Sequence, residues 1–129
     1  MELIRSFGYA FRGIWYSLHG RNMLIHLSAT LVVIGLAVAF SVTGVHAVVL
    51  VISVVVVLGF EAMNTAVEKT CDLIEKLHGL PRPDYRIQVI KDLAAGAVLL
   101  VAMGAAASGW IVSKVRLVEL RRFLRGFVI

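Results

Sequence analysis

The chain has 129 residues, of which 60% are hydrophobic and 16% are charged, and its mean hydropathy is +0.90. Soluble domains carry about 25% charged residues, and disordered chains have low hydrophobicity, so this composition excludes both classes. The length allows one domain. The single cysteine, Cys71, excludes an intramolecular disulfide and a metal site with several cysteine ligands. We therefore expect a small integral membrane protein.

Residues 3–20 are predicted to form an amphipathic helix. Apolar side chains recur at helical spacing from Leu3 to Leu18, while Arg5 and Arg12 lie off that stripe. A cleavable signal peptide needs a continuous apolar core, which this segment lacks. We expect the helix to lie in the membrane surface with Trp15 as an interfacial anchor. The alternative is a helix packed on the protein's own core.

Two long stretches without charged residues predict three membrane-spanning helices. Neither 22–60 nor 93–113 contains an Asp, Glu, Lys or Arg. A transmembrane helix needs about 20 apolar residues, so the first stretch holds two spans, joined by a turn at the polar segment 41–46, and the second holds one. The valine-rich run 48–57 favours a strand by propensity, but a lone strand in lipid leaves its backbone unpaired, so we predict a helix. The predicted spans are 23–42, 47–68 and 93–113.

The basic residues predict how the chain is oriented. Three lie in the N-terminal segment and five in residues 69–91, so eight lie on one side of the membrane, against five in the tail. This excess favours a cytoplasmic side for the N-terminus and the central segment. The two prolines of segment 80–84 indicate a loop. Residues 114–129 are predicted to form a basic amphipathic tail on the outer side, with Leu117, Leu120, Leu124 and Phe127 along one face.

The second span is expected to carry one acidic face. Counted from Glu61, positions 64, 68, 72 and 75 return to nearly the same side of a helix. Lys91 and Asp92 would face this side, where the third span begins. The acidic face would run from inside the membrane to the cytoplasmic surface. It consists of Glu61, Asn64, Glu68, Asp72 and Glu75.

The acidic face predicts an acidic, metal-binding site at the membrane interface, built from residue types that phosphoryl transfer also uses. An ionisable group at bilayer depth is costly and marks a functional site, which applies most strongly to Glu61. Carboxylate and amide oxygens suit Mg²⁺, and a lysine suits phosphate as a point charge. For Asp72 and Glu75 the alternative is a solvated helix end paired with Lys69 and Lys76. His26 and His46 are interpreted as packing or interfacial residues.

Several segments together resemble the prokaryotic diacylglycerol kinase and undecaprenol kinase family. The resemblance covers about residues 4–113 and leaves the basic tail outside. It implies a lipid-kinase domain over residues 1–113, built as an all-α membrane protein with a surface helix and three spans. It also implies a homotrimer with sites at subunit interfaces. The matching segments are GYAFRG from Gly8, HGRNM from His19, EAMNTAVE from Glu61 with Asp72 after it, and KDLAAGAVLL from Lys91.

The family implies phosphorylation of a lipid hydroxyl by ATP with Mg²⁺ as cofactor. By motif position, Glu61 would be the general base, Asn64 a partner of the transferred phosphate and Glu68 a metal ligand. The nucleotide would be contacted by Tyr9, Lys91 and Asp92. The lipid alcohol would be diacylglycerol, giving phosphatidic acid, or undecaprenol, giving undecaprenyl phosphate. The expected partners are ATP, the lipid alcohol and the bilayer, and nucleic acid is not among them.

The chain departs from the family pattern in three places. Gly20 stands where the family usually has a metal-binding glutamate, the segment between Glu68 and Lys91 is longer and lacks a Tyr-His pair, and the tail is extra. One alternative is therefore a catalytically impaired member that binds nucleotide or lipid without turnover. Another is a proton-coupled transporter with Glu61 as the carrier, which predicts inverted repeats that the sequence lacks.

Overall fold

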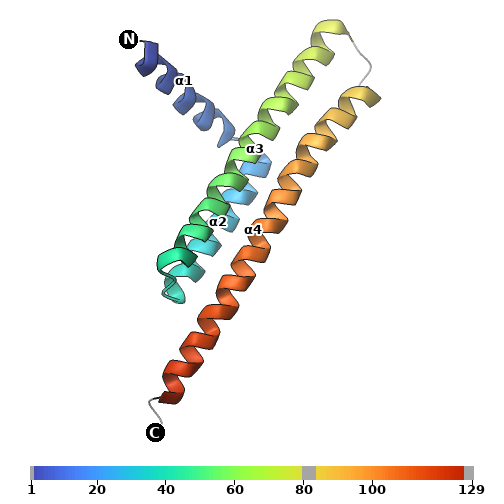
Figure 1. The fold of residues 1–129 in the computed structure, drawn as a ribbon. Helices are drawn as coiled ribbons and strands as arrows, with labels where there is room; N and C mark the ends of the chain where they lie inside the picture. Colours follow the sequence, from blue (N-terminus) through green and yellow to red (C-terminus); the bar gives the residue numbers. More distant parts are fainter. Residues whose placement is uncertain (1, 80–83, 127–129) are drawn as a thin grey trace.

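The structure, a computed structural model, describes residues 2–79 and 84–126. These residues form four α-helices and no strand (Figure 1). The all-α prediction is therefore confirmed for this part of the chain. In chain order, the helices are α1 (Glu2–Ser17), α2 (Arg21–Ala39), α3 (Gly44–His78) and α4 (Tyr85–Gly126).

Helices α2, α3 and α4 are each long and apolar enough to cross a membrane, which confirms the three predicted spans. At 1.5 Å per residue, α2 is about 28 Å long, close to the 30 Å of a bilayer core. Helices α3 and α4 are about 52 Å and 63 Å long, so both project beyond it. The valine-rich run 48–57 is helical, and α2 and α3 are joined at residues 40–43, close to the predicted turn.

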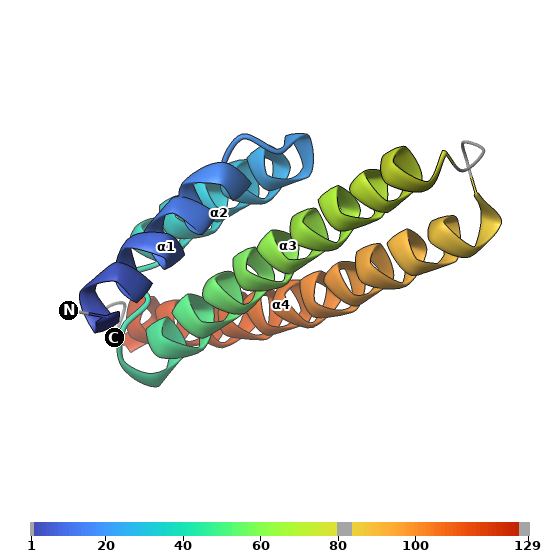
Figure 2. The ribbon, with the colours of Figure 1, turned by 90° about the horizontal axis from the view of Figure 1, so that it is seen from above.

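Helices α3 and α4 run side by side as an antiparallel hairpin and make the most extensive contact in the molecule (Figures 1 and 2). Helix α2 packs against α3, and α1 diverges from the hairpin, touching α3 near the α1–α2 junction (Figure 1). The α1–α2 junction, the end of α3 and the start of α4 lie toward one end of the molecule, and α4 ends at the other. This arrangement places the N-terminal segment and the central segment on the same side of a membrane.

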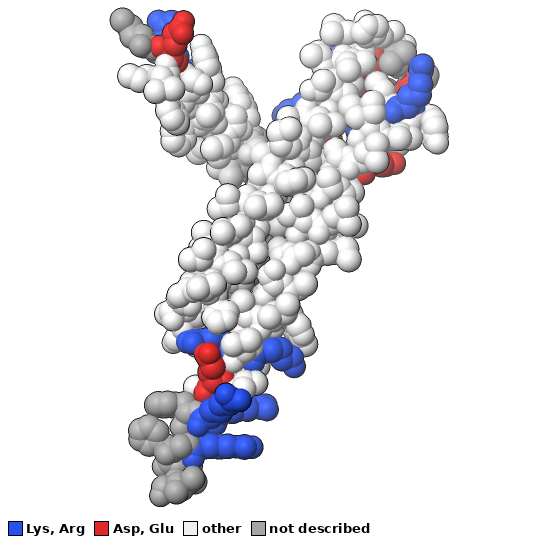
Figure 3. Space-filling view, viewed as in Figure 1, with Lys and Arg blue, Asp and Glu red and all other residues white. Residues whose placement is uncertain are grey.

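Most large apolar side chains point outward instead of into a core. Met23, Val57 and Val98 are among the few buried apolar residues. Lys, Arg, Asp and Glu gather at the ends of the molecule and leave the middle uncharged on the face shown in Figure 3. An exposed apolar middle between charged ends is the surface that a bilayer or neighbouring subunits cover. Helix α1 also exposes large apolar residues, including Phe7 and Trp15.

The two helices of the hairpin end and begin at well-defined caps. Helix α3 ends at Gly79, whose φ of 59° is left-handed and whose N–H donates to the Glu75 carbonyl. Asp84 precedes α4 and accepts a hydrogen bond of 2.9 Å from the Arg86 backbone N–H. The Arg86 side chain donates to the same carboxylate and holds the pKa of Asp84 below its usual value. The rest of the predicted 80–84 loop lies outside the described residues.

Helix α4 continues without a break from the third span into the predicted tail, up to Gly126. The tail is thus an extension of the span over residues 114–126, and Phe127 lies outside the described residues. Within this extension, Arg116 reaches back to the end of α2. Its Nε donates to the Phe40 carbonyl at 3.3 Å, Nη2 donates to the Ser41 carbonyl, and Nη1 binds Glu119 at 2.7 Å. Arg116 therefore satisfies backbone carbonyls that the end of α2 leaves open.

This contact predicts that Arg116→Ala destabilises the fold. Charge-assisted hydrogen bonds to two carbonyls would be lost, so we expect the free energy of unfolding to fall by about 1.5–3 kcal/mol. Thermal unfolding in detergent micelles measures the change. Arg121→Ala is the matched control, because Arg121 is exposed on the same helix. Equal melting temperatures for the two variants would contradict a structural role for Arg116.

Candidate active site

Glu61 is a buried carboxylate where α3 leaves the predicted membrane core. Glu61 is only 2% exposed. A span of about 20 residues that starts at Gly44 ends near Asn64, so Glu61 lies just inside the predicted boundary of the membrane core. Its Oε2 is 3.9 Å from Nε2 of His26 on α2. Both residues line a pocket of about 230 Å³ that also touches α4 at Ala95 and Ala102. The predicted base thus lies in a small pocket formed by three helices.

Asn64 lies one turn beyond Glu61 and is 3% exposed. Its Nδ2 donates to Oε1 of Glu68 at 3.1 Å. Its Oδ1 is buried and has no hydrogen-bond partner among the described residues. An unpaired buried acceptor costs about 1–3 kcal/mol, so natural proteins keep few of them. Asn64 Oδ1 is therefore left open to a group outside the described residues.

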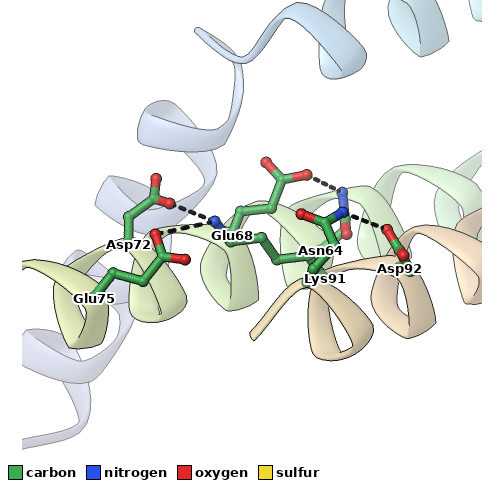
Figure 4. A network of polar contacts seen from close by, with 7 residues as sticks. Asn64, Glu68, Asp72, Glu75, Lys91 and Asp92 are labelled. Atoms are coloured by element: carbon green, nitrogen blue, oxygen red, sulfur yellow. Dashed lines mark hydrogen bonds and ion pairs between the residues drawn. The ribbon is translucent and has the colours of Figure 1, made fainter. Parts of the chain in front are cut away.

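Lys91 on α4 joins the two helices of the hairpin. Its Nζ is 2.7 Å from Oδ1 of Asp72 and 3.8 Å from Oε2 of Glu75, as Figure 4 shows. Glu75 is buried and Asp72 is exposed. Asp92, the next residue on α4, is exposed and accepts a hydrogen bond of 2.7 Å from Gln88. Lys91 therefore meets the acidic face across the hairpin, whereas the described partner of Asp92 lies on its own helix.

The structure brings most of the predicted site residues together along the hairpin. Asn64 is hydrogen-bonded to Glu68, and Glu61 is one turn before Asn64 on the same helix. Lys91 reaches this helix at Asp72 and Glu75 (Figure 4). Asp72 and Glu75, for which the sequence also allows pairing with Lys69 and Lys76, both contact Lys91.

Tyr9 is the predicted site residue that lies apart from this group. It is on α1, which diverges from the hairpin (Figure 1), and it is 64% exposed. Its described contact is with Arg12, whose guanidinium carbon lies 4.9 Å from the centre of the Tyr9 ring. Within one chain, therefore, Tyr9 does not join the other predicted nucleotide ligands.

The site offers oxygen ligands that fit Mg²⁺ only in part. No group of three His, Cys, Asp or Glu side chains in residues 2–79 and 84–126 could hold a metal ion. Glu68 and the unpaired Asn64 Oδ1 are nevertheless neighbouring hard oxygen donors. Mg²⁺ is often bound by one or two protein oxygens, with water and substrate phosphates completing its shell. The donor set therefore fits a magnesium ion that arrives with a nucleotide.

Comparison with known proteins identifies the family. The family described as Prokaryotic diacylglycerol kinase matches residues 8–113, which contain all of the predicted site residues. The chain belongs to the prokaryotic diacylglycerol kinase family. The match ends at Ser113, so the basic extension of α4 lies outside the family region.

A diacylglycerol kinase from Synechocystis sp. is 34% identical to the chain over 111 residues. This stretch is 84% of the present chain and 60% of that relative, so the chain spans about three fifths of the relative's length. No solved structure matches the chain.

Sequence reasoning missed the contact between His26 and Glu61, because it interprets His26 as a packing or interfacial residue. Simple counting could have found it. His26 precedes Ser41 by nearly as many positions as Glu61 follows Gly44, so an antiparallel pair of helices joined there brings them to similar depth. A histidine and a glutamate at similar depth in the membrane are candidates for pairing.

Because Asn64 Oδ1 is an unpaired acceptor, we predict that Asn64→Leu changes the stability of the fold and the binding of nucleotide in opposite directions. Leucine has a similar shape and removes the buried unsatisfied oxygen, and the half-exposed Glu68 can be solvated, so we expect the free energy of unfolding to rise by about 1 kcal/mol. Nucleotide binding should weaken at the same time. Thermal unfolding and nucleotide titration in detergent measure the two effects. A lowered melting temperature with unchanged nucleotide binding would assign Asn64 a purely structural role.

Proposed function

We propose that the chain is an ATP- and Mg²⁺-dependent lipid kinase, which phosphorylates the hydroxyl of diacylglycerol or undecaprenol. The observation that carries the proposal is the buried carboxylate of Glu61 at the membrane end of the acidic face of α3. At its other end, this face contacts Lys91 of α4 through Glu75. A base within the lipid layer and phosphate-binding groups outside it are what this reaction needs. Family membership and the name of the Synechocystis relative support the same activity.

In the proposed reaction, the lipid hydroxyl reaches Glu61 from the bilayer and ATP reaches Lys91 from the water. The hydroxyl oxygen attacks the γ-phosphorus of ATP, a new oxygen–phosphorus bond forms, and the bond to the departing ADP breaks. Glu61 takes the proton from the attacking hydroxyl. Asn64 contacts the transferred phosphate, and Lys91 balances its charge. Lys91 would then exchange part of its contact with Asp72 for a contact with phosphate.

Bound Mg²⁺ would neutralise phosphate charge and orient the nucleotide. Glu68 would hold the ion, and its hydrogen bond from Asn64 fixes the direction of the carboxylate. Asp92, exposed at the start of the third span, and Tyr9 would contact the nucleotide.

We place the protein in the inner membrane of a bacterium with this site toward the cytoplasm. The basic residues at the α1–α2 and α3–α4 end outnumber those of the tail, which supports that orientation. The exposed apolar residues of α1, such as Phe7, support a helix that lies in the membrane surface. ATP is present in the cytoplasm, so the orientation also agrees with the proposed reaction.

Transfer of labelled phosphate from ATP, measured with the purified protein and a panel of lipid alcohols, tests the function. The panel contains diacylglycerol and undecaprenol, so the preferred lipid is read from the same assay. We expect Glu61→Gln to lower kcat by about 10²–10⁴-fold, because the amide takes up no proton. Glu2→Gln is the matched control, since Glu2 is an exposed carboxylate at the start of α1. Full activity of Glu61→Gln would refute Glu61 as the base.

The functional unit is proposed to be a homotrimer. Tyr9 lies away from the site of its own chain, so its contact with a nucleotide would be made at a neighbouring subunit (Figure 1). Small residues such as Gly104 and Ala107 are exposed on α4 and permit close approach of another helix. We expect native mass spectrometry in detergent to show three copies of the 14.1 kDa chain. A spectrum of monomers alone would contradict shared sites.

Gly20 favours a second candidate, a family member that binds nucleotide or lipid without turnover. The family glutamate is missing at this position, yet the structure has room for it. Gly20 has an ordinary φ of −74°, and a Cβ there would lie 3.4 Å from the Ser17 carbonyl oxygen and 3.7 Å from Thr65 Oγ1. Thr65 is on α3 between Glu61 and Glu68, so a side chain at position 20 starts next to the candidate metal ligand.

We therefore expect Gly20→Glu to lower the Mg²⁺ concentration needed for half-maximal activity or nucleotide binding by about five- to tenfold, or about 1 kcal/mol. A second carboxylate would supply a ligand that water or phosphate oxygens otherwise provide. Glu68→Gln should shift the requirement the opposite way. Magnesium titration of both variants measures the shifts. An unchanged requirement in both would contradict a metal site between α2 and α3.

A further inference from the structure

His26 is the described partner of the proposed base. In the described part of the chain, it is the only residue whose basic group is recorded within 4 Å of the Glu61 carboxylate, with 3.9 Å between Nε2 and Oε2. Glu61 is 3% exposed at its side chain, so a charged carboxylate there needs a partner. The distance exceeds a hydrogen bond, but catalytic contacts are often long in the absence of substrate and tighten when it binds.

His26 also stands where two cavities meet. It lines the 230 Å³ pocket with Glu61 and Asn64, and it lines a second cavity of about 390 Å³ between α2, α3 and α4. The second cavity is mainly apolar, with walls that include Leu36, Val54 and Trp110. Ala102 on α4 belongs to both cavities and leaves space opposite the imidazole. A hydroxyl attached to an apolar chain in the larger cavity would therefore meet His26 as it approaches Glu61.

We propose that His26 is a positioning residue, which holds the Glu61 carboxylate at the junction of the two cavities and directs one of its oxygens toward the lipid hydroxyl. The inference rests on the proposed function, with Glu61 as the proton acceptor. The imidazole N–H is a donor on α2, so the orientation of Glu61 depends on how α2 packs against α3. His26 touches neither phosphate nor metal in this arrangement, and its effect is on the transfer step.

The experiment compares three variants of the full chain in the labelled-phosphate assay. His26→Leu keeps the bulk and removes the donor, whereas His26→Gln keeps an N–H donor. We expect His26→Leu to lower kcat by about 10–100-fold, because a small displacement of a reacting group has an effect of that order. The KM for Mg-ATP should change less than the kcat. His26→Gln should recover most of the activity. His46→Leu, a half-buried histidine on α3 near the far end of the molecule, should match the wild type.

The outcomes distinguish a failure of the positioning role of His26 from a failure of the proposed function. If Glu61→Gln abolishes transfer while His26→Leu has the wild-type kcat, the positioning role is wrong and the proposed function stands. If Glu61→Gln retains full activity, the base assignment fails and the inference fails with it. Equal losses in His26→Leu and His26→Gln would show that an N–H donor at position 26 does not restore the activity, and would overturn the inference. Should His26→Leu fail to fold, His26→Met provides the same comparison with His26→Gln.

Discussion

The backbone of a chain inside a bilayer must satisfy its own hydrogen bonds, because hydrocarbon offers none. This requirement makes the valine-rich run 48–57 helical against its strand propensity. It also sets the geometry of the site. A helix that has formed to cross the membrane continues into water until a residue stops it, and α3 continues to His78, before Gly79. One uninterrupted helix therefore carries carboxylates from the buried Glu61 to the surface at fixed angular spacing.

The periodicity of a helix is what made the acidic face predictable. Once residues 47–68 are helical, the spacing of Glu61, Asn64 and Glu68 places them on one side without further information. The Lys91 contact with Asp72 and Glu75 was equally accessible, because a short connection makes α3 and α4 antiparallel neighbours. The caps Gly79 and Asp84 bound this connection.

The ends of the helices were less predictable than the spans. Charge shows where a chain leaves the membrane, but a helix ends only where its backbone is interrupted. Residues 114–125 contain neither proline nor glycine, so α4 continues to Gly126, well beyond the predicted span end at 113. The same distinction explains why α3 extends past residue 68 to His78.

Contacts that depend on the rotation of α2 could not be derived from spacing alone. Hydropathy is nearly uniform around this helix, so the sequence does not indicate which side faces α3. The pairing of His26 with Glu61 and the hydrogen bond from Arg116 to Phe40 are both set by that rotation. The position of Tyr9 depends on the angle between α1 and α2 at Gly20, which is likewise not encoded in a repeat.

The continuity of α4 has a mechanical consequence. Arg116 is hydrogen-bonded to the end of α2, and Lys91 lies earlier on the same uninterrupted helix. At the rise of an α-helix the two residues are about 38 Å apart. Sliding of α4 along α3 would break the hydrogen bonds of Arg116, whereas tilting about that point keeps them. Over this length, a tilt of α4 by about 5° displaces Lys91 by about 3 Å. A displacement of that size is enough to break the contact between Lys91 and Asp72. A tilt of α4 about Arg116 would therefore move Lys91, the proposed phosphate-binding residue, while the contact between α4 and the end of α2 is kept.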